Sequence, residues 1–265
     1  MSNLKLKDRI AIYEDASKSK LLPKLPVIIC VNGRSFSKIT SLLDKPFAVS
    51  FAECMYSTLG RLVQEIDGAI FGYSFNDEIV IVTRNDQSLD TSPWFDNDAQ
   101  KIASAVASVA TVHFNNCVIA NELNLIGDAV FTANTFVVPN ITEAINVMVS
   151  KQQKAMQSAV QLACLYELLK KYDKNDIREM LMGTSYDDKV NLLAEQFGID
   201  FNSYPQPFRR GVACYRTPTV VSFEGEEKIK GKWKLNSEIP IFTKDHTFLG
   251  QIFKTGSDIF RKESL

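Results

Sequence analysis

Val27-Ile28-Ile29-Cys30-Val31-Asn32-Gly33 is a run of five apolar residues that ends in an asparagine and a glycine. A run with no polar residue is typical of a strand that is covered on both faces. The glycine lets the backbone turn sharply where the strand ends. A second apolar stretch, from Ala69 to Val82, is interrupted by Asn76-Asp77-Glu78. We expect this second stretch to form a hairpin whose turn lies at the polar residues.

Helices are predicted before and after the hairpin from the spacing of the apolar residues. Apolar residues between Phe47 and Ile66 recur at intervals of three and four, and the alanine-rich stretch 94–116 predicts a long helix before a strand at 129–138. The order strand, helix, strand, strand, helix, strand is that of the ferredoxin-like split βαβ unit. We therefore expect an α+β protein with a palm-type nucleotide-binding core in residues 1–140. Residues 141–265 are expected to form a helical and β-rich region that packs on this core as one compact unit.

The composition is that of an ordinary soluble globular protein. Of the 265 residues, 45% are hydrophobic and 23% are charged, and the formal net charge is -1, so no overall positive field predicts nucleic-acid binding. The apolar runs are expected to be shorter than the ~20 residues that a membrane span needs, so no membrane partner is expected. The five cysteines are scattered and include no CxxC pair. This pattern argues against structural zinc and disulfides and predicts a cytoplasmic protein with reduced thiols.

The turn after the first strand is a candidate phosphate-binding loop. Residues 33–37 follow the strand directly, and their backbone N–H groups could surround a phosphate, since the glycine allows close approach. An Asn-Gly pair after a strand is also a common turn that binds no ligand. Taken alone, the segment favours that simpler interpretation.

Asp77 and Glu78 are candidate metal ligands. In a split βαβ unit the two central strands are neighbours, so the end of the first strand is expected to meet the hairpin turn. Carboxylates at this junction could hold Mg²⁺ ions for phosphoryl or nucleotidyl transfer. Two acids in a turn are otherwise usually solvated. The apolar sequence on both sides of Asp77 and Glu78 favours a site.

The two histidines do not predict a catalytic centre. Neither His113 nor His246 has a cysteine or serine partner at a recognisable spacing. We therefore expect no triad and assign both to the surface or the core.

Several ordered motifs together resemble the tRNA-His guanylyltransferase family and its bacterial and archaeal Thg1-like relatives. The matching segments are Asn32-Gly33-Arg34-Ser35-Phe36, Lys45-Pro46-Phe47, Gly72-Tyr73-Ser74-Phe75-Asn76-Asp77-Glu78 and Phe208-Arg209-Arg210-Gly211. The resemblance extends over about residues 7–216. Several motifs in the family's order are more specific than any single one.

The resemblance implies Mg²⁺-dependent addition of a nucleotide, GTP, to the 5′ end of a tRNA or another RNA, with GTP or ATP as substrates. It also implies a two-metal site and a homo-oligomer, either a dimer or a tetramer. The catalytic residues implied are Asp77, Glu78 and Asn32, and the metal ligands implied are Asn32, Gly33 and Asp77. The nucleotide-binding residues implied are Gly33, Arg34, Ser35, Phe36, Ser37, Lys45, Asn76 and Lys101. The RNA-binding residues implied are Lys151, Gln152, Lys189, Arg209 and Arg210.

The chain departs from the family pattern at the position of the leading metal ligand. Asn32 stands where the family has an aspartate. An amide oxygen can bind a metal ion but lacks the negative charge that holds Mg²⁺ beside phosphates. An alternative hypothesis is therefore a catalytically degenerate member that binds a nucleotide, an RNA or a protein partner without nucleotidyl transfer.

Overall fold

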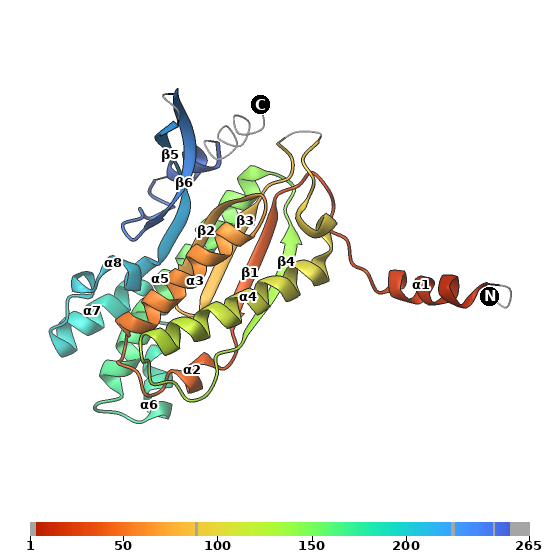
Figure 1. Ribbon diagram of the computed structural model, residues 1–265. Coiled ribbons are helices and arrows are strands. Elements are labelled where there is room, and N and C mark those ends of the chain that lie inside the picture. The colour runs from red at the N-terminus through yellow and green to blue at the C-terminus, as the bar shows by residue number, and fades with distance from the viewer. Residues whose placement is uncertain (1–3, 88–89, 224–225, 246, 255–265) are drawn as a thin grey trace.

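A six-stranded sheet forms the centre of the computed structural model, which describes residues 4–87, 90–223, 226–245 and 247–254. The strand order is β4-β1-β3-β2-β5-β6, and every neighbouring pair is antiparallel (Figure 1). The strands are β1 (Val27–Gly33), β2 (Ala69–Phe75), β3 (Glu78–Thr83), β4 (Phe131–Val137), β5 (Val212–Phe223) and β6 (Glu226–Asn236). The expected mixed fold of helices and sheet is confirmed.

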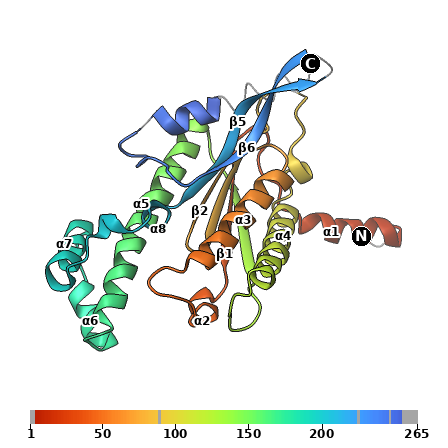
Figure 2. The ribbon, with the colours of Figure 1, turned by 60° about the vertical axis from the view of Figure 1, so that its left-hand side comes forward.

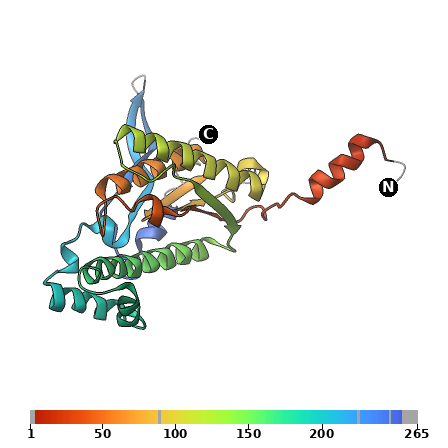
Figure 3. The ribbon, with the colours of Figure 1, turned by 90° about the horizontal axis from the view of Figure 1, so that it is seen from below.

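Helices cover both faces of the sheet. α3 (Val49–Glu65) and α4 (Ala99–Ala120) lie side by side on one face, and α5 (Ile141–Leu168) lies on the other (Figure 2). The view from below shows the three layers edge-on (Figure 3). The shorter helices are α1 (Leu6–Ala16), α2 (Phe36–Ile39), α6 (Lys174–Leu181), α7 (Tyr186–Phe197) and α8 (Gln206–Arg210), with 3₁₀ turns at Trp94–Asn97 and Phe201–Ser203.

β1 is buried on both faces, as its apolar run predicts. Ile28 and Cys30 belong to the hydrophobic cluster that includes Met148 of α5. Ile29 and Val31 point the other way and belong to the cluster that includes residues of α3 and α4. Successive side chains of a strand alternate between its two faces, so an unbroken apolar sequence is what a three-layer packing requires.

The second part of the chain contributes both to a helical layer and to the sheet. α5 supplies the layer opposite α3 and α4, and β5 pairs with β2 in the register Phe71↔Tyr215 and Ser74↔Val212. Strands from before and after residue 140 therefore share one sheet. The division of the chain into two regions at this residue stays a prediction.

α4 corrects one expectation about apolar length. Among the described residues it is the one helix that is long and apolar enough, by length and composition, to cross a membrane. Alanine counts as apolar although it is small, so an alanine-rich helix reaches this threshold. One such helix is weak support for a membrane span, since the core helix of a soluble protein passes the same test. α4 packs on the sheet through Ile102, Val106, Ala110 and Phe114.

Candidate functional site

The end of β1 and the β2–β3 hairpin meet at one point, as the sequence predicts. The N–H of Gly33 donates a hydrogen bond of 2.9 Å to the carbonyl oxygen of Asp77. Asn32 lies opposite Glu78 in the β1–β3 register, and Asn76 and Asp77 form the two-residue turn of the hairpin. The three polar side chains of the predicted centre therefore come from neighbouring backbone positions.

The loop after β1 presents fewer free amides than its length suggests. The N–H of Gly33 is used by Asp77, and the N–H of Arg34 donates to Val130 at 2.8 Å. The amides of residues 35–37, which lead into the first turn of α2, take no backbone acceptor among the described residues. Helix-opening amides are the ones that remain available for an anion. The part of residues 33–37 that could contact phosphate is therefore its second half.

Gly33 is required by close packing. A Cβ atom built on Gly33 would lie 2.4 Å from a ring carbon of Phe36, and that ring is buried among other aromatic rings. Asn76 and Ser35 have φ values of 49° and 57°, a left-handed conformation that asparagine tolerates better than most residues. The glycine and the asparagine of these two turns are therefore residues that the local packing and backbone conformation favour.

A cavity of about 390 Å³ opens beside this junction. Gly33, the residues 35–37, Asn76 and Asp77 form its polar end. Its apolar walls come from α3, α5 and α8 and include Phe47, Phe51, Tyr56, Leu162, Tyr166 and Phe208. Pockets of 300–1,000 Å³ with apolar walls and a few convergent polar groups are typical of small-molecule sites.

The aromatic wall of the cavity was not predicted from the sequence. Phe47 stacks on Phe208 with ring centroids 5.0 Å apart and an interplanar angle of 10°, and it also contacts the ring of Tyr204 edge-on. The sequence contains this wall only as two separate motifs, Lys45-Pro46-Phe47 and Phe208-Arg209-Arg210-Gly211. That they form one wall required the fold.

Burial shifts the pKa of two charged groups at the cavity. Desolvation raises the pKa of Asp77, and the nearby charge of Glu78 adds to this rise. Burial lowers the pKa of Lys45, whose ammonium donates to the carbonyl of Thr40 at 2.8 Å. The Lys45 ammonium also lies 5.7 Å from the ring centroid of Tyr166. A ligand with compensating charges would stabilise both groups.

Glu78 is paired with a lysine from the opposite layer. Lys151 of α5 forms an ion pair and hydrogen bond with the carboxylate of Glu78. Burial alone lowers the pKa of Lys151, but the hydrogen bond to Glu78 and its other neighbours raise it overall. Burial raises the pKa of Cys30, which lies beside the same lysine. Lys151 is thus a partner of the candidate centre, and the RNA contact predicted for it stays a prediction.

The donor set fits one divalent cation better than two. Asp77 lies in the turn beside the end of β1, where Asn32 pairs with Glu78. Hard oxygen ligands such as a carboxylate and an amide oxygen suit Mg²⁺ when phosphates complete the shell. The Glu78 carboxylate is already neutralised by Lys151. Among the described residues, no group of three or more histidine, cysteine or acidic side chains is placed to hold a metal ion.

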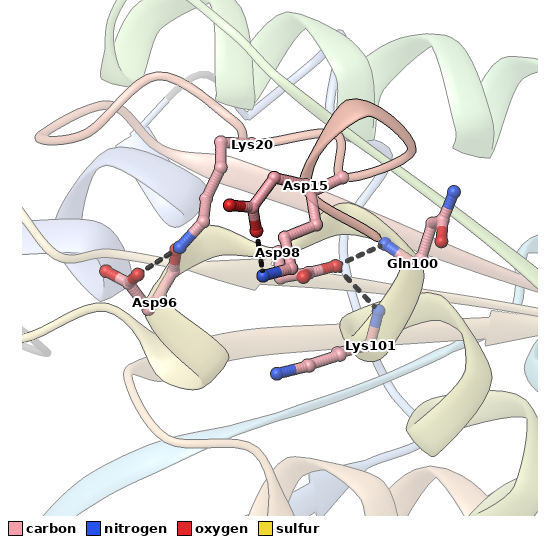
Figure 4. A network of polar contacts seen from close by, with 7 residues as sticks. Asp15, Lys20, Asp96, Asp98, Gln100 and Lys101 are labelled. Carbon is pink, nitrogen blue, oxygen red and sulfur yellow. Dashed lines mark hydrogen bonds and ion pairs between the residues drawn. The ribbon is translucent and has the colours of Figure 1, made fainter. Parts of the chain in front are cut away.

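Lys101, a predicted nucleotide-binding residue, lies away from this cavity. It is at the start of α4, where its backbone N–H donates to the capping side chain of Asp98 at 3.1 Å, close to the ion pair of Lys20 with Asp96 (Figure 4). The next residue, Ile102, lines a second cavity together with Val27, at the opposite end of β1 from Gly33. A strand of this length spans about 20 Å. The prediction fails because α4 runs with its C-terminal end toward the site.

The residues predicted to bind RNA are not equally available. The side chain of Gln152 is 1% exposed and bonds to backbone groups of Pro240 and Phe242, so it holds the fold together and cannot reach RNA. Lys189 donates to the carbonyl of Thr184 and lines a surface cavity with Lys154.

The two predicted arginines both lie on α8. Arg209 donates to the carbonyl of Tyr204 and to Asn202. Arg210 is half-buried, and burial together with the charge of Arg209 lowers its pKa. Its Nε atom is buried without a hydrogen-bond partner among the described residues.

Comparison with known proteins gives the same assignment along most of the chain. A family model described as tRNAHis guanylyltransferase matches residues 7–139, and a model described as Thg1 C terminal domain matches residues 162–247. tRNA(His) guanylyltransferase 1 of Arabidopsis thaliana is 25% identical over 231 residues, which are 84% of this chain and 39% of that protein. The Schizosaccharomyces pombe tRNA(His) guanylyltransferase is 22% identical over 224 residues, which are 82% of this chain and 84% of that protein. The chain thus spans about two fifths of the length of the Arabidopsis relative.

Solved structures agree with these sequence matches. A bacterial tRNA(His) guanylyltransferase (Thg1)-like protein in complex with ATP has a TM-score of 0.79 and 28% identity, over 94% of this chain and 99% of that chain. A complex of such a protein with GTP has a TM-score of 0.73 and 28% identity, over 93% and 98% of the two chains. The first family model alone covers half of the 265 residues, and the second continues it to residue 247. The chain belongs to the tRNAHis guanylyltransferase (Thg1) family.

Proposed function

We propose that this protein binds a nucleoside triphosphate in the cavity beside Gly33 and Asp77 and adds a nucleotide to the 5′ end of a tRNA or another RNA. The observation that carries the proposal is the direct hydrogen bond between Gly33 and Asp77, which joins the amide-bearing loop to the half-buried acid. Solved structures of bacterial Thg1-like proteins with the same fold contain ATP in one case and GTP in another. The homologues that share most of this chain are named tRNA(His) guanylyltransferases.

Each side of the cavity has a role in this proposal. The amides of residues 35–37 bind phosphate oxygens, and Lys45 neutralises their charge. Phe47 and Phe208 give the flat apolar surface on which a base stacks. Arg34, whose side chain is exposed, would contact phosphates from the outer edge of the loop.

Asp77 and Asn32, together with the backbone of Gly33, would hold Mg²⁺ against the triphosphate. When bound, the ion supplies Lewis-acid neutralisation of the transferred phosphoryl group. The half-buried carboxylate of Asp77 gains stability from such a cation, because desolvation without a counter-charge raises its pKa. Glu78 supports the centre through Lys151 and is not a free ligand for a second ion.

The finer features of the fold belong to the same proposal. The order β4-β1-β3-β2 with two helices on one face supports a palm-type, ferredoxin-like core. A homo-oligomer, dimer or tetramer, is supported by α1, which projects from the body and has no buried residue (Figure 3). An isolated helix of this length is marginal in water, so a second copy would stabilise it. A cytoplasmic location is proposed from the reduced, scattered cysteines.

A catalytically degenerate protein is the second candidate. Two observations favour it: Asn32 lacks the charge of a carboxylate, and Glu78 is neutralised by Lys151. Such a protein would keep the cavity and bind a nucleotide, an RNA or a protein partner without transferring a nucleotide.

Incubation with labelled GTP, ATP, Mg²⁺ and a 5′-monophosphorylated tRNA tests both candidates. Transferase activity predicts label at the 5′ end, and Asp77→Ala should abolish it, whereas Asp187→Asn on the exposed surface of α7 should not. Calorimetric titration with GTP measures binding separately. Binding without incorporation, with incorporation restored by Asn32→Asp, would select the degenerate protein. The absence of both GTP binding and incorporation would overturn the transferase and the nucleotide-binding form of the degenerate protein.

A further inference from the structure

A cluster of two thiols, a hydroxyl and an imidazole lies between α3 and α4, on residues that do not line the nucleotide cavity. The thiol of Cys117 donates to the hydroxyl oxygen of Ser57 at 3.5 Å, and this hydroxyl lies 3.0 Å from Nε2 of His113. Cys54 is one helical turn before Ser57, and its sulfur lies 3.9 Å from the amide nitrogen of Asn121. Ser57 and His113 are 56 positions apart, so the sequence spacing did not reveal a partner for this histidine.

The geometry forms a proton relay that starts at Cys117. The thiol hydrogen points to Ser57, and the Ser57 hydroxyl can donate to Nε2 when the neutral imidazole carries its proton on Nδ1. Burial, and then the charge of Arg61, lower the pKa of His113 below 6.5. The imidazole is therefore neutral at pH 7 and able to accept a proton. This arrangement resembles the way an adjacent base activates a nucleophile.

The two thiols differ in accessibility. Cys117 is half-buried and Ser57 beside it is exposed, whereas Cys54 is 1% exposed. Burial raises the pKa of Cys54 to about 11, and the negative charge that Cys117 carries as a thiolate, together with a hydrogen bond between the two cysteines, adds to this rise. A small oxidant can reach Cys117 from solvent, and Cys54 is held as a neutral thiol against it.

We propose that Cys117 is a peroxide-reactive cysteine and that Cys54 is its resolving partner, so that oxidation closes a reversible disulfide between α3 and α4. The Cys117 thiolate attacks the O–O bond of hydrogen peroxide or an organic hydroperoxide and becomes a sulfenic acid, releasing hydroxide or an alkoxide. The Cys54 thiol then attacks this sulfur, the S–S bond forms, and the sulfenic oxygen leaves as water. Two electrons pass from the sulfurs to the peroxide, and an external dithiol restores the reduced form.

The disulfide would lock a helix that also contributes to the nucleotide cavity. Ala52 and Tyr56 of α3 line that cavity. Ser57 contacts Cys117 of α4 and Cys54 contacts Asn121 at the end of α4, and the two helices lie side by side (Figure 1). Oxidation therefore fixes α3 without blocking the cavity itself.

Peptide mapping of the full chain after treatment with hydrogen peroxide tests the proposal. A non-reducing digest should contain a peptide that links residue 54 to residue 117 and disappears with dithiothreitol. In Cys54→Ala the sulfenic acid should persist and be trapped by dimedone at Cys117. Ser57→Ala should slow the loss of the Cys117 thiol, because it breaks the relay.

Cys164→Ser is the matched control, because Cys164 is another buried thiol whose pKa burial raises to about 11. It should leave the 54–117 peptide unchanged. We expect Cys117 to lose its thiol at least about tenfold faster than Cys164 in the wild type, because a raised pKa lowers the thiolate fraction. Equal rates at the two cysteines, or an oxidised wild-type protein with neither a linked peptide nor a dimedone adduct, would overturn the proposal.

Discussion

Replacing Lys151 with methionine keeps most of the aliphatic side chain and removes the ammonium that pairs with Glu78. The side chains of Lys151 and Glu78 are 20% and 33% exposed. Breaking a fully buried pair costs about 3–5 kcal/mol, and an exposed pair contributes about 0.2–1 kcal/mol. The partial exposure of this pair places the expected loss between these limits. We expect Lys151→Met to lower the free energy of unfolding by about 1–3 kcal/mol, because it leaves the Glu78 carboxylate beside Asp77 without a counter-charge.

Urea denaturation followed by circular dichroism measures this loss. Lys154→Met is the control, since Lys154 is exposed on the same helix. The double variant Glu78→Gln with Lys151→Met should recover much of the stability, because it no longer leaves a lone carboxylate. A Lys151→Met variant as stable as Lys154→Met at pH 7 would refute the idea that this pair supports the site.

The pH dependence follows from the raised pKa of Lys151. A lysine whose folded-state pKa is raised contributes stability fully below its unfolded pKa of about 10.4 and loses it as the pH rises through the folded-state pKa. The difference between wild type and Lys151→Met should therefore be constant from pH 7 to 9 and shrink above about pH 10.

Three further outcomes are expected. Asp77→Asn should raise the melting temperature at pH 7, because burial raises the pKa of this carboxyl and so disfavours its charged form in the folded state. The gain should vanish as the pH falls below about 3.9, where the folded and unfolded carboxyls are both protonated. Thermal melts at a series of pH values measure this change. Gly33→Ala should lower the stability by about 1–3 kcal/mol and weaken GTP binding in calorimetry, because its Cβ would overlap the buried ring of Phe36; wild-type stability would contradict the packing argument. Gln152→Ala should lower the free energy of unfolding, measured by urea denaturation, by about 2 kcal/mol, because it leaves two backbone groups without their hydrogen-bond partner. Gln153→Ala, at an exposed position of α5, should lower it by less than about 0.5 kcal/mol. Equal losses would count against a structural role for Gln152.

The central strands and the acid-bearing hairpin could be predicted because their signals are local. An unbroken apolar run, a glycine at its end and a polar pair inside a second apolar run each follow from neighbouring residues. The register Asn32↔Glu78 then brought the predicted positions together. The roles assigned to these residues stay predictions until nucleotide binding and transfer are measured.

Predictions failed where the contacts of a side chain depend on how its helix is oriented against the sheet. Lys101 belongs to a helix that was expected, yet α4 begins at the end of the sheet opposite the cavity. Gln152 and Lys151 are neighbours on α5, and the first turns into the core while the second reaches Glu78. Helical periodicity indicates which residues share a face, but it does not say what that face will meet.

The sequence alone determined the alternation of strands and helices, the hairpin with its two acids and the membership of the family, because these depend on short-range patterns and on motifs in order. Only the tertiary structure decided that Glu78 is neutralised from another layer, that Phe47 and Phe208 form one wall, and that His113 meets Ser57 and Cys117. These contacts join residues far apart in the chain. Such contacts are set by how whole layers pack, and packing is a property of the folded chain that no local pattern contains.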